Sequence, residues 1–225
     1  MPTSSSDPQL ECQAIFFDMD GTLIDSEPLW LKSEEELMAR YGYDWTRADQ
    51  EYCLGGPLSK VGLYMAEKAD GAETPEFFVE TMISAVESHL ENSLNFMPGA
   101  IELVDELHQL GFPLALVTAS PRNLLRATLA GLPFKYFSVS VSSDDVTKTK
   151  PHPESYLRAA KMLQVDISKC LVLEDSRTGV TSGLGSGARV VGIEHMLTFD
   201  DHERLATVPS LEGIDAHQLL ALHSK

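Results

Sequence analysis

The stretch IFFDMDGTLIDSE, residues 15–27, decides the fold class of this 225-residue chain. It begins with three apolar residues, as a buried strand does, and Asp18 and Asp20 follow directly. Gly21 permits a tight turn, so two carboxylates one residue apart can converge on one pocket. An ordinary surface turn is the alternative, because Asp-Gly pairs are common turn formers. The apolar run before the pair favours a ligand site at the C-terminal end of a strand in an open α/β sheet.

Short apolar runs indicate further buried parallel strands. The expected strands lie at 14–17, 114–117, 137–141, 171–173 and 190–193. Apolar residues at helical spacing separate the later strands, at 101–110 and from Pro153 onward. The Gly- and Ser-rich stretch 180–188 is a poor helix former, but its place between two strands predicts a crossover helix packed closely on the sheet. Alternating strands and helices predict a doubly wound α/β domain. After His195 we expect loops and a last helix at 215–222.

Residues 26–97 interrupt this alternation and read as helices only. Helical periodicity and terminal Pro and Gly residues predict helices at 28–41, 57–69 and 75–90. We therefore expect an α/β core formed by residues 11–25 and 98–225, with an α-helical domain of residues 26–97 inserted after the first strand. Acidic residues outnumber basic ones in this insertion.

The composition excludes several classes of protein. A formal net charge of −17 disfavours binding to nucleic acid and to anionic membranes, so neither is expected as a partner. The three cysteines, none in a CxxC pair, argue against a disulfide framework or zinc site and indicate reduced thiols. The first ten residues lack the pattern of a signal peptide, and we find no apolar run long enough for a membrane helix. We expect a cytoplasmic protein.

Polar residues also follow the later strands of the expected core. Thr118 ends the apolar run LALV, Lys150 precedes Pro-His-Pro, and Glu174 and Asp175 follow LVL. Each of these has an ordinary explanation on its own: a turn threonine, a loop lysine, and a strand end with a helix cap. Their common order after the first motif is what gives them functional meaning.

These motifs together resemble those of haloacid dehalogenase (HAD) phosphatases. DMDGTLIDSE resembles the family's first motif, LALVTAS the second, KPHPESY the third and LVLEDSRTGV the fourth, in the right order over residues 15 to about 193. The resemblance implies a Rossmann-like core, and the insertion is similar to the helical cap of the family's β-phosphoglucomutase-like branch. It also implies a monomer acting on a small phosphorylated metabolite.

The resemblance implies a role for each motif residue. Asp18 would be the nucleophile that forms an aspartyl-phosphate, and Asp20 would protonate the leaving alcohol and then activate water. Lys150 would neutralise the phosphate and the nucleophile, and the Thr118 hydroxyl and the Ala119 N–H would bind phosphate oxygens. Mg²⁺ is the expected cofactor, because a hard cation offsets the repulsion between the carboxylates and the phosphate. Its ligands would be Asp18, Asp175, the Asp20 carbonyl and, directly or through water, Glu174.

Substrate selection is expected to lie in the cap, which would close over the site as lids do. The candidate specificity residues are Glu27, Trp30, Gly55, Gly56, Lys60, Ser120 and Arg122. Two of them have an equally simple structural explanation, because Trp30 suits the core of the cap and Lys60 suits a solvated helix face. An acidic cap favours a neutral or cationic leaving group such as a sugar or polyol.

Three other functions are alternatives to phosphate hydrolysis. A β-phosphoglucomutase carries a His where this chain has Trp30 and a Lys where it has Pro121, although Arg122 could partly replace that Lys. A dehalogenase lacks the second Asp of the first motif, so Asp20 disfavours that reaction. A non-catalytic binding protein would not need every catalytic position filled. DSEPLW resembles the branch's sugar-phosphate phosphatases, so we favour the hydrolase.

Overall fold

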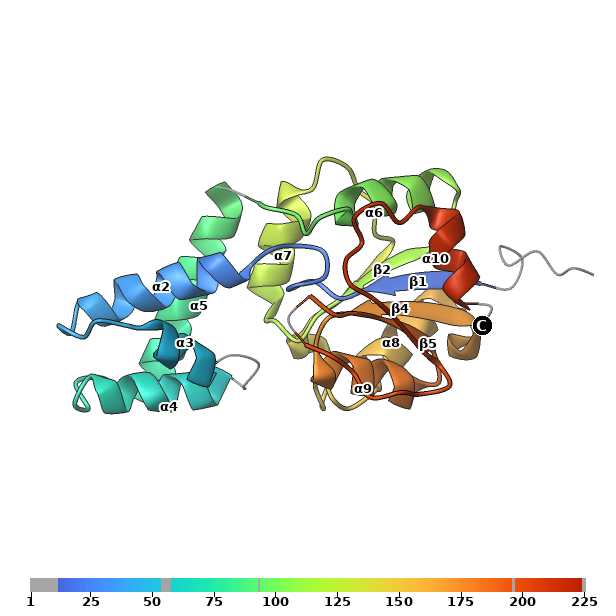
Figure 1. The fold of residues 1–225 in the computed structure, drawn as a ribbon. Coiled ribbons are helices and arrows are strands. Elements are labelled where there is room, and N and C mark those ends of the chain that lie inside the picture. The colour runs from blue at the N-terminus through green and yellow to red at the C-terminus, as the bar shows by residue number, and fades with distance from the viewer. Residues whose placement is uncertain (1–11, 54–57, 93, 196, 224–225) are drawn as a thin grey trace, which may run out of the picture. The chain divides into compact units, whose positions relative to one another are not determined.

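The computed structural model describes residues 12–53, 58–92, 94–195 and 197–223, and these include a six-stranded parallel sheet (Figure 1). The strands are β1 Ala14–Phe17, β2 Leu114–Val117, β3 Val139–Val141, β4 Cys170–Glu174, β5 Arg189–Ile193 and β6 Leu205–Val208. Their order is β3-β2-β1-β4-β5-β6, with every neighbouring pair parallel. The chain therefore winds outward in both directions from β1 and β4, which confirms the predicted doubly wound fold.

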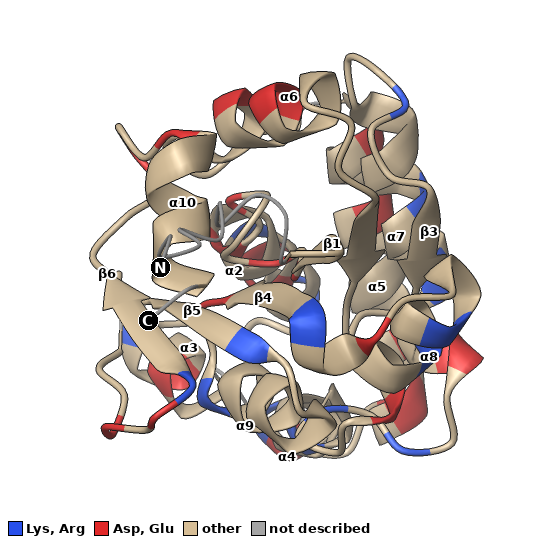
Figure 2. Cartoon of the chain, turned by 90° about the vertical axis from the view of Figure 1, so that its right-hand side faces the viewer, with Lys and Arg blue, Asp and Glu red and all other residues tan. Residues whose placement is uncertain are grey.

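Helices cover both faces of the sheet (Figure 1). Outside residues 26–97 the described helices are α6 Ala100–Gln109, α7 Arg122–Gly131, α8 Glu154–Leu163, α9 Arg177–Ser186 and α10 Ala216–His223, with short 3₁₀ turns η1 Ser143–Asp145 and η2 Ile167–Lys169. Helices α6 and α10 lie on one face, and α8 and α9 on the other. Figure 2 shows acidic positions along α6, in keeping with the net charge of −17. Within the described ranges, no helix is long and apolar enough to cross a bilayer.

Strand β1 is a central strand of the sheet and is buried on all sides. All four of its side chains are fully buried, because β2 and β4 pair with its two edges and helices cover its faces. Phe16 stacks on Tyr156 of α8, with ring centroids 6.3 Å apart. Phe17 points the other way and meets the edge of Phe137. Packing on both faces holds the end of β1, and therefore Asp18, in a fixed place.

The structure separates into two compact units by their internal contacts. The second unit comprises Ser26–Leu94 together with Arg126–Gly131, and everything else belongs to the first. Besides the last part of α7, its helices are α2 Glu27–Ala39, α3 Arg47–Cys53, α4 Leu58–Lys68 and α5 Pro75–Asn92. They enclose an apolar cluster that includes Leu37, Met38, Trp45, Val61, Met65, Phe78 and Met82. The domain boundaries taken from the sequence, residues 26 and 97, remain predictions.

The structure corrects three sequence expectations. Strand β3 begins at Val139 and not at 137, because Phe137 packs in the core before the ladder with β2 starts. Strand β6 lies in the tail that we expected to be loop; it is a half-exposed edge strand, so its LATV sequence carries little apolar signal. Helix α3 was not expected, since RADQEYC is mostly polar and buries only two side chains.

The Gly-rich crossover helix forms as predicted, as α9, with bounds three residues earlier at its start. Close packing explains its composition. A Cβ atom placed on Gly183 would lie 2.9 Å from a methyl group of Val190 on β5, so a larger residue would push the helix off the sheet. Ser176 caps the helix by accepting a hydrogen bond from the Gly179 N–H.

Glu34 predicts a pH-dependent stability of the second unit. It is only 5% exposed, accepts a hydrogen bond from the Trp45 indole N–H, and burial raises its pKa from 4.5 to about 7. Because the folded-state pKa is the higher one, this contribution to stability is present below about pH 4.5 and is lost as pH rises through 7. Glu34→Gln should therefore be more stable than wild type at pH 8, by up to about 3 kcal/mol, and equal to it near pH 4.5.

Denaturant unfolding followed by tryptophan fluorescence measures this effect, because both tryptophans of the chain, Trp30 and Trp45, lie in the second unit. The exposed Glu73→Gln, also in the second unit, is the control and should leave the pH profile unchanged. A Glu34→Gln profile parallel to that of wild type from pH 4.5 to 8 would contradict the prediction.

Candidate active site

Three carboxylates gather at the C-terminal ends of the two central strands. Asp18 follows β1 and its N–H donates to the Leu173 carbonyl, while Glu174 ends β4 and Asp175 comes next. Each of the three offers an oxygen within 4.8 Å of the other two. Strand order reverses between β1 and β4, and this is where open α/β sheets bind their ligands. The topology therefore brings together residues that are 156 positions apart in the sequence.

Lys150 supplies the countercharge for this cluster. Its ammonium donates to Asp18 Oδ1 at 2.5 Å, to Glu174 Oε1 at 2.6 Å and to the Val117 carbonyl at 2.9 Å. The side chains are almost completely buried, with 3% of Lys150, 9% of Asp18 and none of Glu174 exposed. The three donors of the ammonium are all used, so its position between the two carboxylates is fixed.

Asp20 belongs to a second hydrogen-bonded group beside the first. Its Oδ2 accepts from the Ser120 hydroxyl at 2.7 Å and from the Thr118 hydroxyl at 3.3 Å. Thr118 in turn accepts from the Ser120 N–H at 2.9 Å, which shapes the loop after β2 that also contains Ala119. The structure thus places the predicted phosphate-binding loop next to the predicted acid, and Ser120 within that loop.

Two glycines allow the carboxylates to lie so close to the backbone. Gly21 has φ +81°, and a Cβ atom there would lie 2.2 Å from Asp175 Oδ2. A Cβ atom on Gly179, in the first turn of α9, would lie 1.8 Å from the Glu174 carboxylate. A side chain at either position would collide with a carboxylate. The acidic cluster can therefore pack as it does only with glycine at both positions.

The electrostatics of the cluster follow from its burial. Burial raises the pKa of Asp18 well above its usual value, and the nearby Glu174 carboxylate adds to the shift while Lys150 opposes it. Burial and Glu174 likewise raise the pKa of Asp175 to about 7. For Lys150, burial alone would lower the pKa, but Asp18 and Glu174 outweigh it and raise the pKa. One ammonium is therefore too little positive charge for these carboxylates.

The residues present fit a hard divalent cation. Asp18, Glu174 and Asp175 are oxygen donors, the ligand type that Mg²⁺ prefers, and they are close enough to share one ion. The raised pKa values of Asp18 and Asp175 show a shortage of positive charge that an ion would relieve. Thr22, which is fully buried, donates to Asp175 Oδ1 at 3.4 Å on the side of the Gly21 turn.

The described specificity candidates belong to both units. Arg122 of the core ion-pairs with Asp145 at 2.9 Å, and its backbone N–H donates to Asp144. Trp30 is half-buried and packs against the core of the second unit. This is the structural explanation that the sequence analysis gave beside a role in specificity. Lys60 donates to the Tyr52 carbonyl at 2.7 Å and lies over the Tyr52 ring. Glu27 begins α2, and Gly55 and Gly56 lie outside the described residues.

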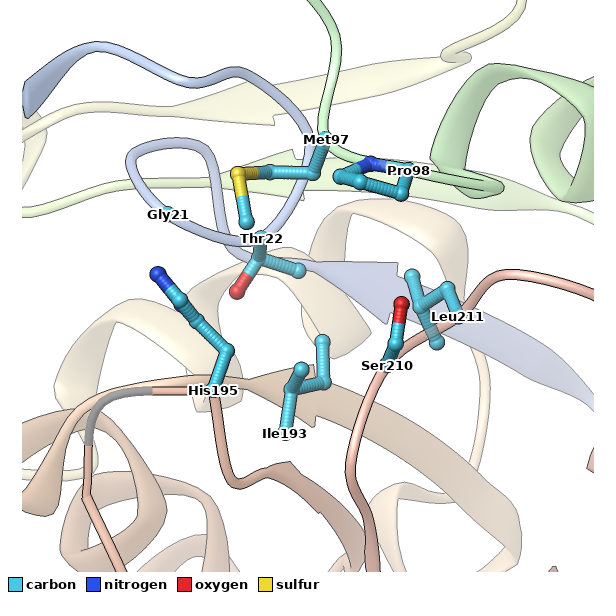
Figure 3. Close-up of a pocket in the computed structure, with 8 residues that line it drawn as sticks. All are labelled: Gly21, Thr22, Met97, Pro98, Ile193, His195, Ser210 and Leu211. Atoms are coloured by element: carbon cyan, nitrogen blue, oxygen red, sulfur yellow. The ribbon is translucent and has the colours of Figure 1, made fainter. Parts of the chain in front are cut away.

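A small cavity of about 110 Å³ adjoins the Gly21 turn (Figure 3). The side chains that line it belong to Thr22, Met97, Pro98, Ile193, His195, Ser210 and Leu211. Of the described residues that form its wall, none is a carboxylate of the cluster. The cavity is therefore distinct from the acidic cluster.

Sequence reasoning missed Tyr156 and Ser176. The hydroxyl of Tyr156 donates to Glu174 Oε1 at 2.7 Å, and that of Ser176 donates to Glu174 Oε2 at 3.1 Å. In the sequence, Tyr156 reads only as part of the apolar face of a helix. Ser176 has a weak signal, since a serine after an acidic pair and before a helix suits an N-cap.

The comparisons with known proteins agree with this geometry. The profile of the haloacid dehalogenase-like hydrolases matches residues 15–193, about four-fifths of the chain. The chain belongs to this family. Hexitol phosphatase A of Escherichia coli is 31% identical over 221 residues, which is 96% of this chain and 92% of that protein. A phosphorylated carbohydrates phosphatase of Thermotoga maritima is 30% identical over 187 residues, 82% of this chain and 87% of that one.

A crystal structure of a HAD hydrolase from Entamoeba histolytica shares the fold, with a TM-score of 0.81 at 24% identity over 95% of this chain and all of that one. The predicted family is thus confirmed, and with it the assignment of the chain as a HAD-type phosphatase. The individual roles of the site residues stay predictions.

The close approach of the Gly179 backbone to the Glu174 carboxylate can be tested with two substitutions on helix α9. Gly179→Ala would force a methyl group into the Glu174 carboxylate, so it should lower the melting temperature and cost most of the activity. Gly185→Ala lies two turns later on α9, where a Cβ atom meets only Pro153 at 3.7 Å or more. Because alanine favours helix more than glycine does, this control should keep full activity with equal or higher stability.

Thermal unfolding and phosphate release from a general phosphomonoester measure both variants side by side. Equal melting temperatures and equal activities of the two variants would contradict the view that the site needs glycine at position 179.

Proposed function

We propose that this HAD-family protein is a magnesium-dependent phosphomonoesterase of small phosphorylated sugars or polyols, acting through an aspartyl-phosphate at Asp18. The observation that carries the proposal is the buried contact of Lys150 with both Asp18 and Glu174, beside Asp175 and the Asp20 loop. A nucleophile, a positive charge for the phosphate and an acid for the leaving group thereby lie within one small region.

The geometry supports a reaction in two displacements. An oxygen of Asp18 forms a bond to phosphorus while the bond from phosphorus to the ester oxygen breaks, and that oxygen takes a proton from the Asp20 carboxyl. Water then forms a bond to phosphorus, the bond to Asp18 breaks, and the proton of the water passes to Asp20. Splitting the reaction helps because uncatalysed phosphomonoester hydrolysis is so slow that the enzyme must lower its barrier by as much as about 25 kcal/mol.

The surrounding residues orient and neutralise these groups. Lys150 keeps the Asp18 oxygen in place and offsets charge that gathers as the phosphoryl group approaches. Ser120 and Thr118 hold Asp20 by hydrogen bonds. In the same loop, the Ala119 N–H would bind phosphate oxygens, as the family resemblance implies. Mg²⁺ held by Asp18, Asp175, the Asp20 carbonyl and, directly or through water, Glu174 would neutralise phosphate charge.

The substrate class rests on the relatives and on charge. Relatives about 30% identical over most of the chain carry the names hexitol phosphatase and phosphorylated carbohydrates phosphatase. The inserted unit is acidic, which favours a leaving group without negative charge. We propose that its residues select the leaving group, with Glu27, Trp30, Lys60 and the segment around Gly55 and Gly56 as the candidates.

Phosphomutase activity is the second possibility, and no observation favours it. Arg122, the one residue that could replace the mutase lysine at the position after Pro121, already pairs with Asp145. A binding protein without activity is less consistent still, because every motif residue is present and Lys150 contacts two of them. A monomer in the cytoplasm, without nucleic-acid or membrane partners, completes the proposal.

Removing the nucleophile should abolish hydrolysis. Asp18→Asn should lower phosphate release at least about 1,000-fold, because an amide oxygen cannot replace the carboxylate in covalent catalysis. A chelator should abolish release by wild type, and added Mg²⁺ should restore it. The exposed Asp201→Asn is the matched control and should keep the wild-type rate. Release that persists in Asp18→Asn or in chelator would refute the mechanism.

A panel of phosphorylated metabolites tests the substrate class. Hexitol and sugar monophosphates should have the highest kcat/KM values, and sugar bisphosphates lower ones, because the second phosphate would be repelled by the acidic unit. Bisphosphates turned over faster than monophosphates would count against this class. Sustained isomerisation of a hexose phosphate with little phosphate released would favour the mutase.

A further inference from the structure

The Tyr156 hydroxyl has no part in the reaction described above, yet it reaches the centre of the acidic cluster. We propose that Tyr156 is a positioning residue, which holds the Glu174 carboxylate and through it the Lys150 ammonium in place for reaction at Asp18. The inference rests on the proposed function, and it assigns Tyr156 no contact with substrate.

Tyr156 touches both partners of the buried ion pair. Its hydroxyl donates to Glu174 Oε1 at 2.7 Å, and the same oxygen accepts from Lys150 at 2.6 Å. The Lys150 ammonium also lies 5.0 Å from the centroid of the Tyr156 ring, within the range of a cation–π contact. One side chain thus fixes the carboxylate by its hydroxyl and the ammonium by its ring.

Packing alone accounts for the ring of Tyr156 but not for its hydroxyl. The residue is fully buried on α8, where it stacks on Phe16 and joins a cluster of apolar side chains. A phenylalanine would fill this space without bringing a polar group into the core, and a buried hydroxyl is costly unless it is hydrogen-bonded. The Glu174 carboxylate is the acceptor that compensates this cost.

Glu174 needs such support because its terminal torsion is intrinsically soft. From the described residues, Oε2 accepts the longer 3.1 Å bond of Ser176, whereas Oε1 receives the short bonds of Tyr156 and Lys150. Without the tyrosine hydroxyl, Lys150 alone would hold Oε1, and rotation of the carboxylate would draw the ammonium away from Asp18. Misplacement of this kind lowers the rate of the chemical step more than it weakens substrate binding.

The test is Tyr156→Phe, which removes the hydroxyl and keeps the ring. We expect a folded protein whose kcat falls about tenfold while KM stays within twofold of wild type. Tyr64→Phe is the matched control, because the Tyr64 hydroxyl also donates to a carboxylate at 2.7 Å, that of Asp49 in the second unit. It should keep the wild-type kcat, although it loses a bond of the same length.

A double-mutant cycle with Glu174→Gln separates positioning from general packing. If Tyr156 acts through Glu174, Tyr156→Phe should reduce kcat little further in the Glu174→Gln background, whereas independent effects would multiply. Multiplying effects, a kcat of Tyr156→Phe within twofold of wild type, or a Tyr156→Phe variant that fails to fold would each overturn the inference. Wild type without magnesium-dependent phosphate release would instead overturn the proposed function, so the two failures are distinguishable.

Discussion

The buried ammonium of Lys150 is the interaction on which the site depends. It lies between Asp18 and Glu174 with almost no exposure to solvent, and it is the one cation seen bonded to the described carboxylates of the cluster. Without it, two carboxylates would face each other in a medium of low dielectric, which costs several kcal/mol for each ion. With it, the charge is still unbalanced, as the raised pKa values of Asp18 and Asp175 indicate. The cluster is therefore built to receive further positive charge.

The fold creates this situation through the order of its strands. The doubly wound sheet brings the end of β1 beside the end of β4 and directs the chain away on both sides. The strand β1 is buried on both faces, so Asp18 cannot move with the loop that follows it. Gly21 and Gly179 then let the backbone approach the carboxylates to within contact distance. Position, burial and charge in the site thus have a common origin in the core.

Much of this arrangement can be predicted from the sequence because it depends on local signals in a fixed order. The run IFF before Asp18, the run LVL before Glu174, and the Pro residues around Lys150 mark strand ends and a loop, and the family resemblance places them together. The same signals predicted the fold class and the helix α9, despite the poor helix propensity of its glycines. Strand β6 was not predicted, because this half-exposed edge strand shows no alternation of apolar and polar residues.

What the sequence could not predict are contacts between side chains that no motif links. Tyr156 lies on the buried face of a helix, where its periodicity predicts packing and says nothing of a hydroxyl directed at Glu174. The ion pair of Arg122 with Asp145 is likewise a product of the tertiary fold. The packing of Trp30 against the core of its unit is, in contrast, one of the two explanations that the sequence allowed. Arg122 had become a specificity candidate through the family resemblance, because it could partly replace the mutase lysine, and Trp30 through its place in the expected cap.

The stereochemical course at phosphorus tests the central claim most directly. Turnover of the best substrate, as a phosphorothioate ester chiral at phosphorus, yields a chiral thiophosphate when the attacking water carries a different oxygen isotope. Transfer through Asp18 requires two in-line displacements, each of which inverts the centre, so the account predicts net retention. Net inversion would mean that water attacks the substrate directly, and Asp18 would then not be the nucleophile.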